Sequence, residues 1–262
     1  MSAARVLTPY IVRPTLAQIA AIASRRPRGG VARGRSGAER RYTLPPSFVS
    51  SVPVTEYWDA AYNVTLGTGA SSWAGMVSGY TLAQASGPSQ PTYSSSDSKF
   101  NGRPSLSANG SQYIGGGPGL TPLPMYFWCV FSAASAAPAA VGSVFSATSN
   151  RLELNQNAGA LTFFSRNTTA TNNNGGVAAI NTAYRGEASF TNSTSDFVKI
   201  GSTNTTGVNA GASTGGNLTV FAGTGQLWAG SVVAILVCAG VPSASERAAL
   251  DSYAVSTWGA AT

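Results

Sequence analysis

The chain has 262 residues, enough for one large all-β domain or for one domain with a tail. It contains 2 cysteines and no histidine, which excludes Ser-His-Asp and Cys-His catalysis and removes most metal-site chemistry. Its formal net charge of +7 is unevenly distributed: residues 1–45 carry nine arginines and one glutamate (+8), and residues 46–262 carry seven basic and eight acidic residues (−1).

Residues 1–49 are predicted to form a basic N-terminal arm. The sequence PTLAQIAAIAS predicts a short helix over 15–23, which is too short to be stable unless it docks onto another surface. The run RRPRGGVARGRSGAERR at 25–41 lacks apolar periodicity and does not fold by itself. The prolines of YTLPPSF at 42–48 predict an extended segment that leads into the domain.

Three interpretations of this arm stay open. Its arginines could dock on an acidic protein surface, neutralise nucleic-acid phosphates, or form a solvated tail. The absence of aromatic residues between Pro14 and Arg41 favours docking on a protein. The residues predicted to make the docking contacts are Leu16, Ile19, Ile22, Arg25, Arg26, Arg28, Arg33, Arg35, Arg40 and Arg41.

Residues 50–262 have the composition of a β-sandwich, with short apolar runs separated by Gly/Asn/Ser/Pro turns. Turns are predicted at NQNAG (155–159), TNNNGG (171–176) and NAGASTGG (209–216). Many short strands at this spacing favour a sandwich or jelly roll. The predicted strands are 125–131, 142–148, 151–156, 160–166, 186–191, 196–202, 217–223 and 227–240.

One helix is predicted, at SASERAALDSYAVSTWG near the C-terminus. Ser243 and Glu246 have the spacing of a capping box, and Gly259 supplies the stop. Leu250, Tyr253, Ala254 and Trp258 fall on one face, so the helix is expected to lie across the edge of the sandwich and to close the fold.

Cys129 and Cys238 each lie in a strongly apolar strand pattern. Such positions favour small buried hydrophobic residues over a disulfide. We therefore expect two reduced, buried thiols.

The segment QLWAGSVVAILVCAGVPSASERAALDSYAVSTWG (226–259) resembles the terminal strand, turn and helix of concanavalin A-like lectin/glucanase (laminin-G-like) domains of bacteriophage structural proteins. YWDAA, SSWAGMVSGYTLAQAS, QPTY and FNGRPSLSANGSQYI, within 57–114, resemble the opening of these domains. The resemblance covers about 57–259 and implies a concanavalin A-like jelly-roll sandwich with one C-terminal helix. Ile235 stands where the family often has an acidic residue, which predicts that its strand is buried on both faces, against a partner. The matching residues of the helix are Glu246, Arg247, Leu250, Tyr253, Trp258 and Gly259.

Glucanases of this fold use clustered carboxylates, and a retaining pair lies about 5 Å apart. No two acidic residues of the body share a strand at that spacing, so no catalytic residue is predicted. GGGPG at 115–119 lacks the Lys-Ser/Thr of a phosphate loop and predicts a turn. Asp97 and Asp196 lack acidic neighbours, so we predict no metal and no cofactor. The candidate residues for stacking on a glycan are Trp73, Tyr80, Tyr93, Tyr113 and Trp228, although tryptophans of this family mostly fill the core.

The expected function is that of a bacteriophage virion structural protein, a capsid decoration or cement protein or a short fibre, anchored by its arm on the particle surface. Its expected partners are a major capsid or other virion protein, further copies of itself in a homo-oligomer, and a cell-surface glycan, with nucleic acid less favoured and no membrane. The alternatives are a carbohydrate-binding adhesin module and a jelly-roll capsid protein whose arm binds nucleic acid. None of these is an enzyme.

Overall fold

The computed structural model describes residues 45–116, 120, 124–135, 141–147, 152–167, 169–191, 196–206, 216–223 and 226–261. All the residues predicted to dock the arm, from Leu16 to Arg41, lie outside these ranges, as does most of the 209–216 turn. By contacts the chain divides into Met1–Thr43 and Leu44–Thr262, and the second unit contains the whole sandwich.

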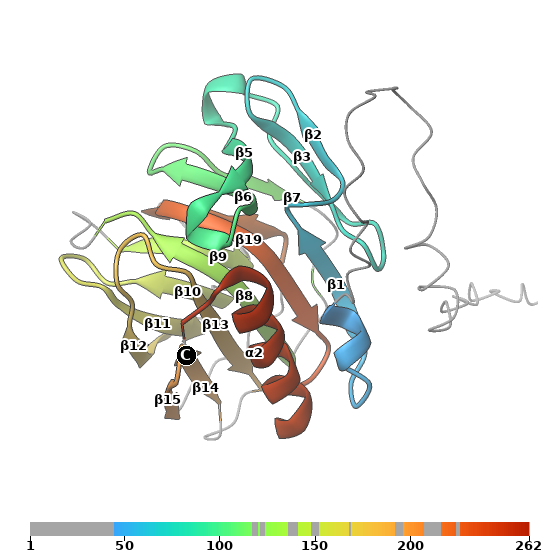
Figure 1. The fold of residues 1–262 in the computed structure, drawn as a ribbon. Coiled ribbons are helices and arrows are strands. Elements are labelled where there is room, and N and C mark those ends of the chain that lie inside the picture. The colour runs from blue at the N-terminus through green and yellow to red at the C-terminus, as the bar shows by residue number, and fades with distance from the viewer. Residues whose placement is uncertain are drawn as a thin grey trace, which may run out of the picture. The chain divides into compact units, whose positions relative to one another are not determined.

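Two antiparallel sheets form the sandwich (Figure 1). The eight-stranded sheet has the order β15 (Thr203–Thr206), β14 (Phe197–Ile200), β13 (Tyr184–Phe190), β8 (Met125–Ala133), β19 (Ala229–Cys238), β6 (Arg103–Asn109) and β5 (Thr92–Asp97), with β1 (Val54–Asp59) also paired to β19. The nine-stranded sheet has the order β12 (Thr169–Val177), β11 (Thr162–Asn167), β10 (Leu152–Gln156), β9 (Gly142–Ala147), β16 (Leu218–Val220), β7 (Ile114–Gly116), β4 (Thr81–Ala83), β3 (Ala70–Ala74) and β2 (Val64–Leu66).

The predicted strands are present, with changes at their ends and one break. Residues 217–223 do not form one strand: they divide into β16 and β17 (Ala222–Gly223), because Phe221 between them has φ +67°. β17 pairs with β18 (Gln226–Leu227) in a short hairpin that lies against β9. The seven strands before Met125, β1 to β7, were not among the predicted strands, and each has only three to seven residues.

The predicted turn TNNNGG is wrong, because residues 171–176 lie within β12, paired to β11. Two glycines allow this edge strand to approach the other sheet closely. A Cβ on Gly175 would lie 2.6 Å from Val198, and a Cβ on Gly176, where φ is +115°, would lie 2.8 Å from Thr203. Contact with β14 and β15 thus overrides the local turn preference.

The segment PPSF, predicted to be extended, has a different structure. Pro45–Phe48 forms a 3₁₀ helix and not an extended segment, since proline fits the first turn of a helix. The following chain packs on the domain, with the Phe48 and Tyr253 rings 5.5 Å apart and Val49 buried.

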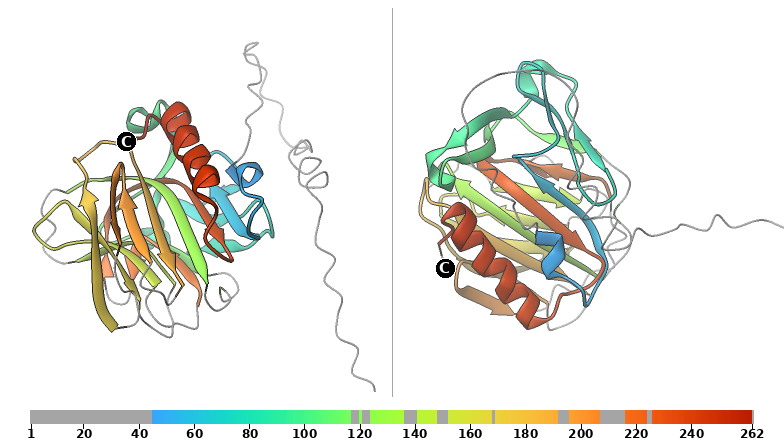
Figure 2. Two further views of the ribbon diagram at one scale, coloured as in Figure 1. Left: turned by 90° about the horizontal axis from the view of Figure 1, so that it is seen from below. Right: turned by 45° about the vertical axis from the view of Figure 1, so that its right-hand side comes forward.

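The C-terminal helix α2 (Ala244–Trp258) has the predicted capping box at Ser243 and Glu246 and ends at Gly259, which has φ +66°. It lies across the outer face of the eight-stranded sheet and not across the sandwich edge (Figures 1 and 2). Its apolar side packs on β8 and β19, where Trp128 and Trp258 have ring centroids 6.0 Å apart. Covering the face hides far more apolar surface than an edge could.

β19 is buried on both faces, as predicted from Ile235, an apolar residue at a position that is often acidic in the resembling family. Ile235 points into the core between the sheets, and Leu236 points to the layer beneath α2. The second face is covered by the chain's own helix. A bulge after Val232 brings Val233 and Ala234 both to the helix side, which keeps the alternation in register.

Both cysteines are free and buried, and they lie on opposite sides of this sheet. Cys129 belongs to the core between the sheets, whereas Cys238 lies in the layer beneath α2. Burial raises the pKa of the Cys129 thiol far above its ordinary value and that of Cys238 to about 12. Neither thiol is therefore placed to act as a nucleophile.

Candidate functional site

Glu56, at the start of the domain, holds the loop between β3 and β4. Its carboxylate accepts four backbone N–H groups, from Tyr57 (2.9 Å), Val77 (2.7 Å), Ser78 (3.0 Å) and Tyr80 (2.9 Å). Such an arrangement satisfies a buried charge and fixes the loop, but it leaves no lone pair directed to a ligand.

Two carboxylates, Glu187 on β13 and Asp251 on α2, belong to an ionic cluster between the helix and the sheet. Lys199 Nζ lies 3.1 Å from Glu187 Oε1 and 2.6 Å from Asp251 Oδ2, and Arg185 also pairs with Asp251. Tyr126 donates to Glu187 at 2.9 Å. Burial and the nearby Asp251 charge raise the pKa of Glu187. Arg247 completes the cluster at 3.5 Å from Glu187 Oε2, and the ion pairs join the helix to β13 and β14.

The remaining acidic side chains also bind parts of the fold. Asp59 accepts from the Tyr57 hydroxyl, Asp97 from Ser105, Asp196 from Thr191, and Glu246 caps α2. Within the described ranges no three Asp, Glu or Cys side chains come together as a metal site would require. Each of these described carboxylates thus has a hydrogen-bond or ion-pair partner within the fold.

The outer face of the nine-stranded sheet carries a row of small, uncharged residues, which we call the neutral row. Cross-strand pairing aligns Thr219, Gly115, Ala83, Ser72 and Thr65, from β16 to β2. Their strand neighbours Trp73, Leu82 and Ile114 point into the core, so the row points outward. Thr65 and Ala83 are exposed, and the other three are half-buried.

Glu153 continues this row toward the other end of the sheet but is covered. It pairs across the strands with Ser146, which pairs with Thr219. The β17–β18 hairpin lies over it, so that a Cβ on Gly223 would be 2.7 Å from Glu153 Oε1. Glu153 accepts from Ser146 and Asn155 and is fully buried. The exposed part of the row is consequently without charge.

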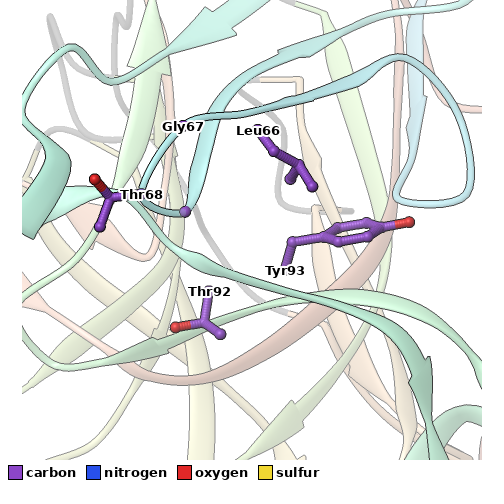
Figure 3. A pocket seen from close by; sticks show the side chains of 6 residues that line it. Leu66, Gly67, Thr68, Thr92 and Tyr93 are labelled. Carbon is purple, nitrogen blue, oxygen red and sulfur yellow. The ribbon is translucent and has the colours of Figure 1, made fainter.

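A shallow hollow lies between the turn that joins β2 to β3 and the start of β5 (Figure 3). It has a volume of about 120 Å³. Leu66 extends into it from β2 and Tyr93 from β5, as Figure 3 shows. Leu66 is 58 % exposed, the most exposed large hydrophobic residue in the described part of the chain. The lining residues are Leu66, Gly67, Thr68, Gly69, Thr92 and Tyr93, none of which is charged.

The buried Gln90 holds the wall of this hollow in place. Its Oε1 accepts from Gly69 N at 2.9 Å, and its Nε2 donates to the Gln84 carbonyl at 2.9 Å. The backbone beside it is bonded directly, with Ala70 N donating to the Pro91 carbonyl at 2.7 Å. Gly69 is required here, since a Cβ would lie 2.5 Å from the Pro91 carbonyl oxygen. The turn is thus fixed before any ligand arrives.

The structure separates the aromatic residues that the sequence suggested for glycan contact. Trp73 and Trp228 are buried in the core, with their indole N–H groups donating to the Asp59 carbonyl and to Gln156, so they offer no face to a ligand. Tyr80 and Tyr93 are half-buried against the core, and Tyr113 is 39 % exposed. Of the five, Tyr93 alone lines the hollow. Leu66, Thr68 and Thr92 were not predicted as site residues, because a short turn and a strand start carry no recognisable binding motif.

No protein-family model matches the chain, and no curated protein matches it in sequence. Solved structures do match in fold. Domain 4 of AbnA, a GH43 extracellular arabinanase from Geobacillus stearothermophilus, solved in complex with arabinotriose, has a TM-score of 0.55 and 11% identity, over 76% of this chain and 98% of the domain. Trypanosoma rangeli sialidase in complex with 2,3-difluorosialic acid has a TM-score of 0.56 and 9% identity, over 80% of this chain and 37% of the sialidase.

An arabinofuranosidase complexed with arabinofuranosyl-alpha-1,2-xylobiose gives a TM-score of 0.51 at 9% identity, over 72% of this chain and 51% of the enzyme. The chain thus spans about a third of the length of the sialidases it matches and nearly all of the arabinanase domain. These likenesses show a concanavalin A-like β-sandwich fold. They do not extend to activity, because sites are built on folds independently.

Proposed function

We propose that the sandwich is a carbohydrate-binding module without catalytic activity. The observation that supports this most is the combination of a fold that covers 98% of a domain solved with arabinotriose and a set of carboxylates that all bind parts of the fold. The lining of the hollow is without charge and includes the hydroxyl-bearing residues Thr68 and Thr92. Such a surface suits an uncharged, hydroxyl-rich ligand better than a nucleic acid or an acidic protein.

The test is a glycan array probed with the full-length protein, followed by titration calorimetry with the glycans that bind. Binding of neutral oligosaccharides without release of reducing sugar supports the proposal. Hydrolysis of a bound glycan would contradict the absence of catalysis, and an array without any binding would contradict the function itself.

A second candidate, a virion structural role, is favoured by the charge distribution. The arm carries +8 and the body −1, and the division between them lies near the boundary of the compact unit that begins at Leu44. We propose that the arm fastens a neutral, glycan-binding sandwich to the surface of a particle, as a decoration protein or short fibre. Several arginine–carboxylate contacts of about 1 kcal/mol each would hold it, and added salt would weaken them.

Replacing Arg25, Arg26, Arg28, Arg33 and Arg35 by Ser tests this second candidate. The variant should leave the particle while its Tm stays unchanged. Normal occupancy of the variant on particles would show that the sandwich itself makes the contacts. Nucleic acid that co-purifies and is removed by salt would identify the arm as a nucleic-acid ligand instead.

A further inference from the structure

We propose that the hollow between the β2–β3 turn and β5 is a binding site for a single neutral sugar ring, with the Tyr93 ring as its stacking platform. The inference rests on the proposed carbohydrate-binding function and adds where the ligand binds and what chemistry it has. The hollow, and not the neutral row or Tyr113, is the site of first contact.

The two long side chains of the hollow provide an apolar contact surface. Tyr93 is half-buried and its inner part packs on the core, so its ring is held in one orientation. Leu66 reaches the same space from the other wall and is 58 % exposed. Because Gln90 fixes the backbone of the turn, only the Leu66 side chain itself has to be ordered when a ligand covers it. A sugar ring has an apolar C–H face that matches this surface.

The rest of the lining is polar and without charge. Thr68 and Thr92 have hydroxyl groups that both donate and accept hydrogen bonds, and both are exposed. Because the lining includes no arginine or lysine, it does not favour a carboxylated sugar or a phosphate. The ligand class is therefore a neutral mono- or oligosaccharide.

The size of the hollow limits how much ligand it holds. Pockets for drug-sized ligands have volumes of about 300–1,000 Å³, and the hollow has about 120 Å³. It therefore receives one ring, and any further rings of the chain lie outside it. A protein partner would require a much larger contact area than this hollow offers.

The experiment compares two exposed threonines on end strands. In full-length protein, Thr92→Arg places a long charged side chain at the hollow, and Thr65→Arg places the same side chain on the neutral row. The ligands are glucose, galactose and arabinose, their trisaccharides, and sialic acid, with binding measured by NMR chemical-shift titration. We expect Thr92→Arg to weaken binding of a neutral sugar by about tenfold or more and Thr65→Arg to leave it within about twofold.

Tyr93→Ala and Tyr93→Phe complete the test. The alanine variant should weaken binding by about tenfold, and the phenylalanine variant, which keeps the ring, should bind within about threefold of the unchanged protein. Tyr113→Ala, outside the hollow, should bind normally. Since Tyr93→Ala also removes a core contact, the Tm of this variant is measured as well. If Tyr93→Ala unfolds, the test depends on Thr92→Arg.

The outcomes separate the site from the function. Neutral sugars that bind equally to Thr92→Arg but not to Thr65→Arg would place the ligand on the neutral row, overturning the inference and keeping the proposed function. Preferred binding of sialic acid would overturn the neutral ligand class. A full-length protein that binds none of these sugars, and nothing on the glycan array, would overturn both.

Discussion

The outer face of the eight-stranded sheet is covered by α2, and five charged side chains form one cluster at this contact. The exposed part of the neutral row on the other sheet carries no charge. Both faces belong to one sandwich and share one core. The difference shows how a chain with few charges distributes them: the ionic groups attach the helix, and the exposed row of the other sheet has none. Substitutions on the two faces should therefore have very different consequences.

The largest effect is expected for Trp258→Ala on the covered face. Trp258 is buried beside Trp128, and its loss leaves a cavity between α2 and the sheet. The free energy of unfolding should fall by about 3–5 kcal/mol, as measured by urea denaturation. Val255→Ala on the same helix is the control, since Val255 is 39 % exposed and should change stability by less than about 1 kcal/mol.

Thiol labelling of the same variant sharpens the comparison. Both cysteines should resist thiol reagents in the unchanged native protein, because burial raises both thiol pKa values. In Trp258→Ala, Cys238 beneath α2 should react before Cys129 in the inter-sheet core. Equal labelling rates would mean that the helix and the sandwich open together.

The second effect is expected for Lys199→Met. The substitution removes the cation that lies between Glu187 and Asp251, and Glu187 has no exposure to solvent. Breaking such a pair should lower the free energy of unfolding by about 2–4 kcal/mol. Lys99→Met is the matched control: Lys99 pairs with Asp97 at 3.1 Å but is 27% exposed, so about 1 kcal/mol or less is expected. Equal losses would show that the covered cluster is solvated.

A third, smaller effect concerns Glu246, which joins the start of α2 to the chain that enters the sandwich. Its carboxylate accepts from the backbone N–H groups of Ser50 (2.6 Å), Ser51 (2.8 Å) and Ser243 (2.9 Å). Partial desolvation opposes the shift, but hydrogen bonds from Ser51, Ser50 and Ser243 lower the pKa of Glu246 well below its ordinary 4.5. Glu246→Gln should cost about 1 kcal/mol near neutral pH.

The pH dependence of this variant has a definite sign. Because the folded-state pKa of Glu246 is lowered, its contribution to stability is present above pH 4.5 and is lost as the pH falls toward the folded-state value. The stability difference between the unchanged protein and Glu246→Gln should therefore shrink in acid, as followed by denaturation from neutral pH downward. A constant difference would mean that the carboxylate contributes only neutral hydrogen bonds.

The smallest effect is expected on the neutral row. Thr65 and Ala83 are exposed, and substituting either by Arg should change the free energy of unfolding by about 0.5 kcal/mol or less. Thermal denaturation of the two variants measures this. A loss above about 1 kcal/mol would show that the row is packed against another part of the chain, and the contrast between the two faces would fail.

Local sequence signals determined the parts of the fold that depend on neighbouring residues. The capping box of Ser243 and Glu246, the stop at Gly259 and the apolar face with Leu250 and Trp258 need no distant partner to be recognised, and the structure confirms them. Ile235, which stands where the resembling family often has an acidic residue, likewise predicted that the β19 strand is buried on both faces. The resemblance of 57–259 added the sandwich fold.

Tertiary structure decided the elements and the site whose determinants lie far apart in the chain. Residues 171–176 became a strand because β11 pairs with them and their glycines approach the other sheet. The helix lies across a face of the sheet and not along its edge, because β8 and β19 are apolar on both faces and the helix buries the outer one. Leu66 and Tyr93 line one hollow because the buried Gln90 holds the β2–β3 turn in place. Trp73, in contrast, is buried in the core. Local propensity cannot place such residues, because their environment is made by strands that meet only after folding.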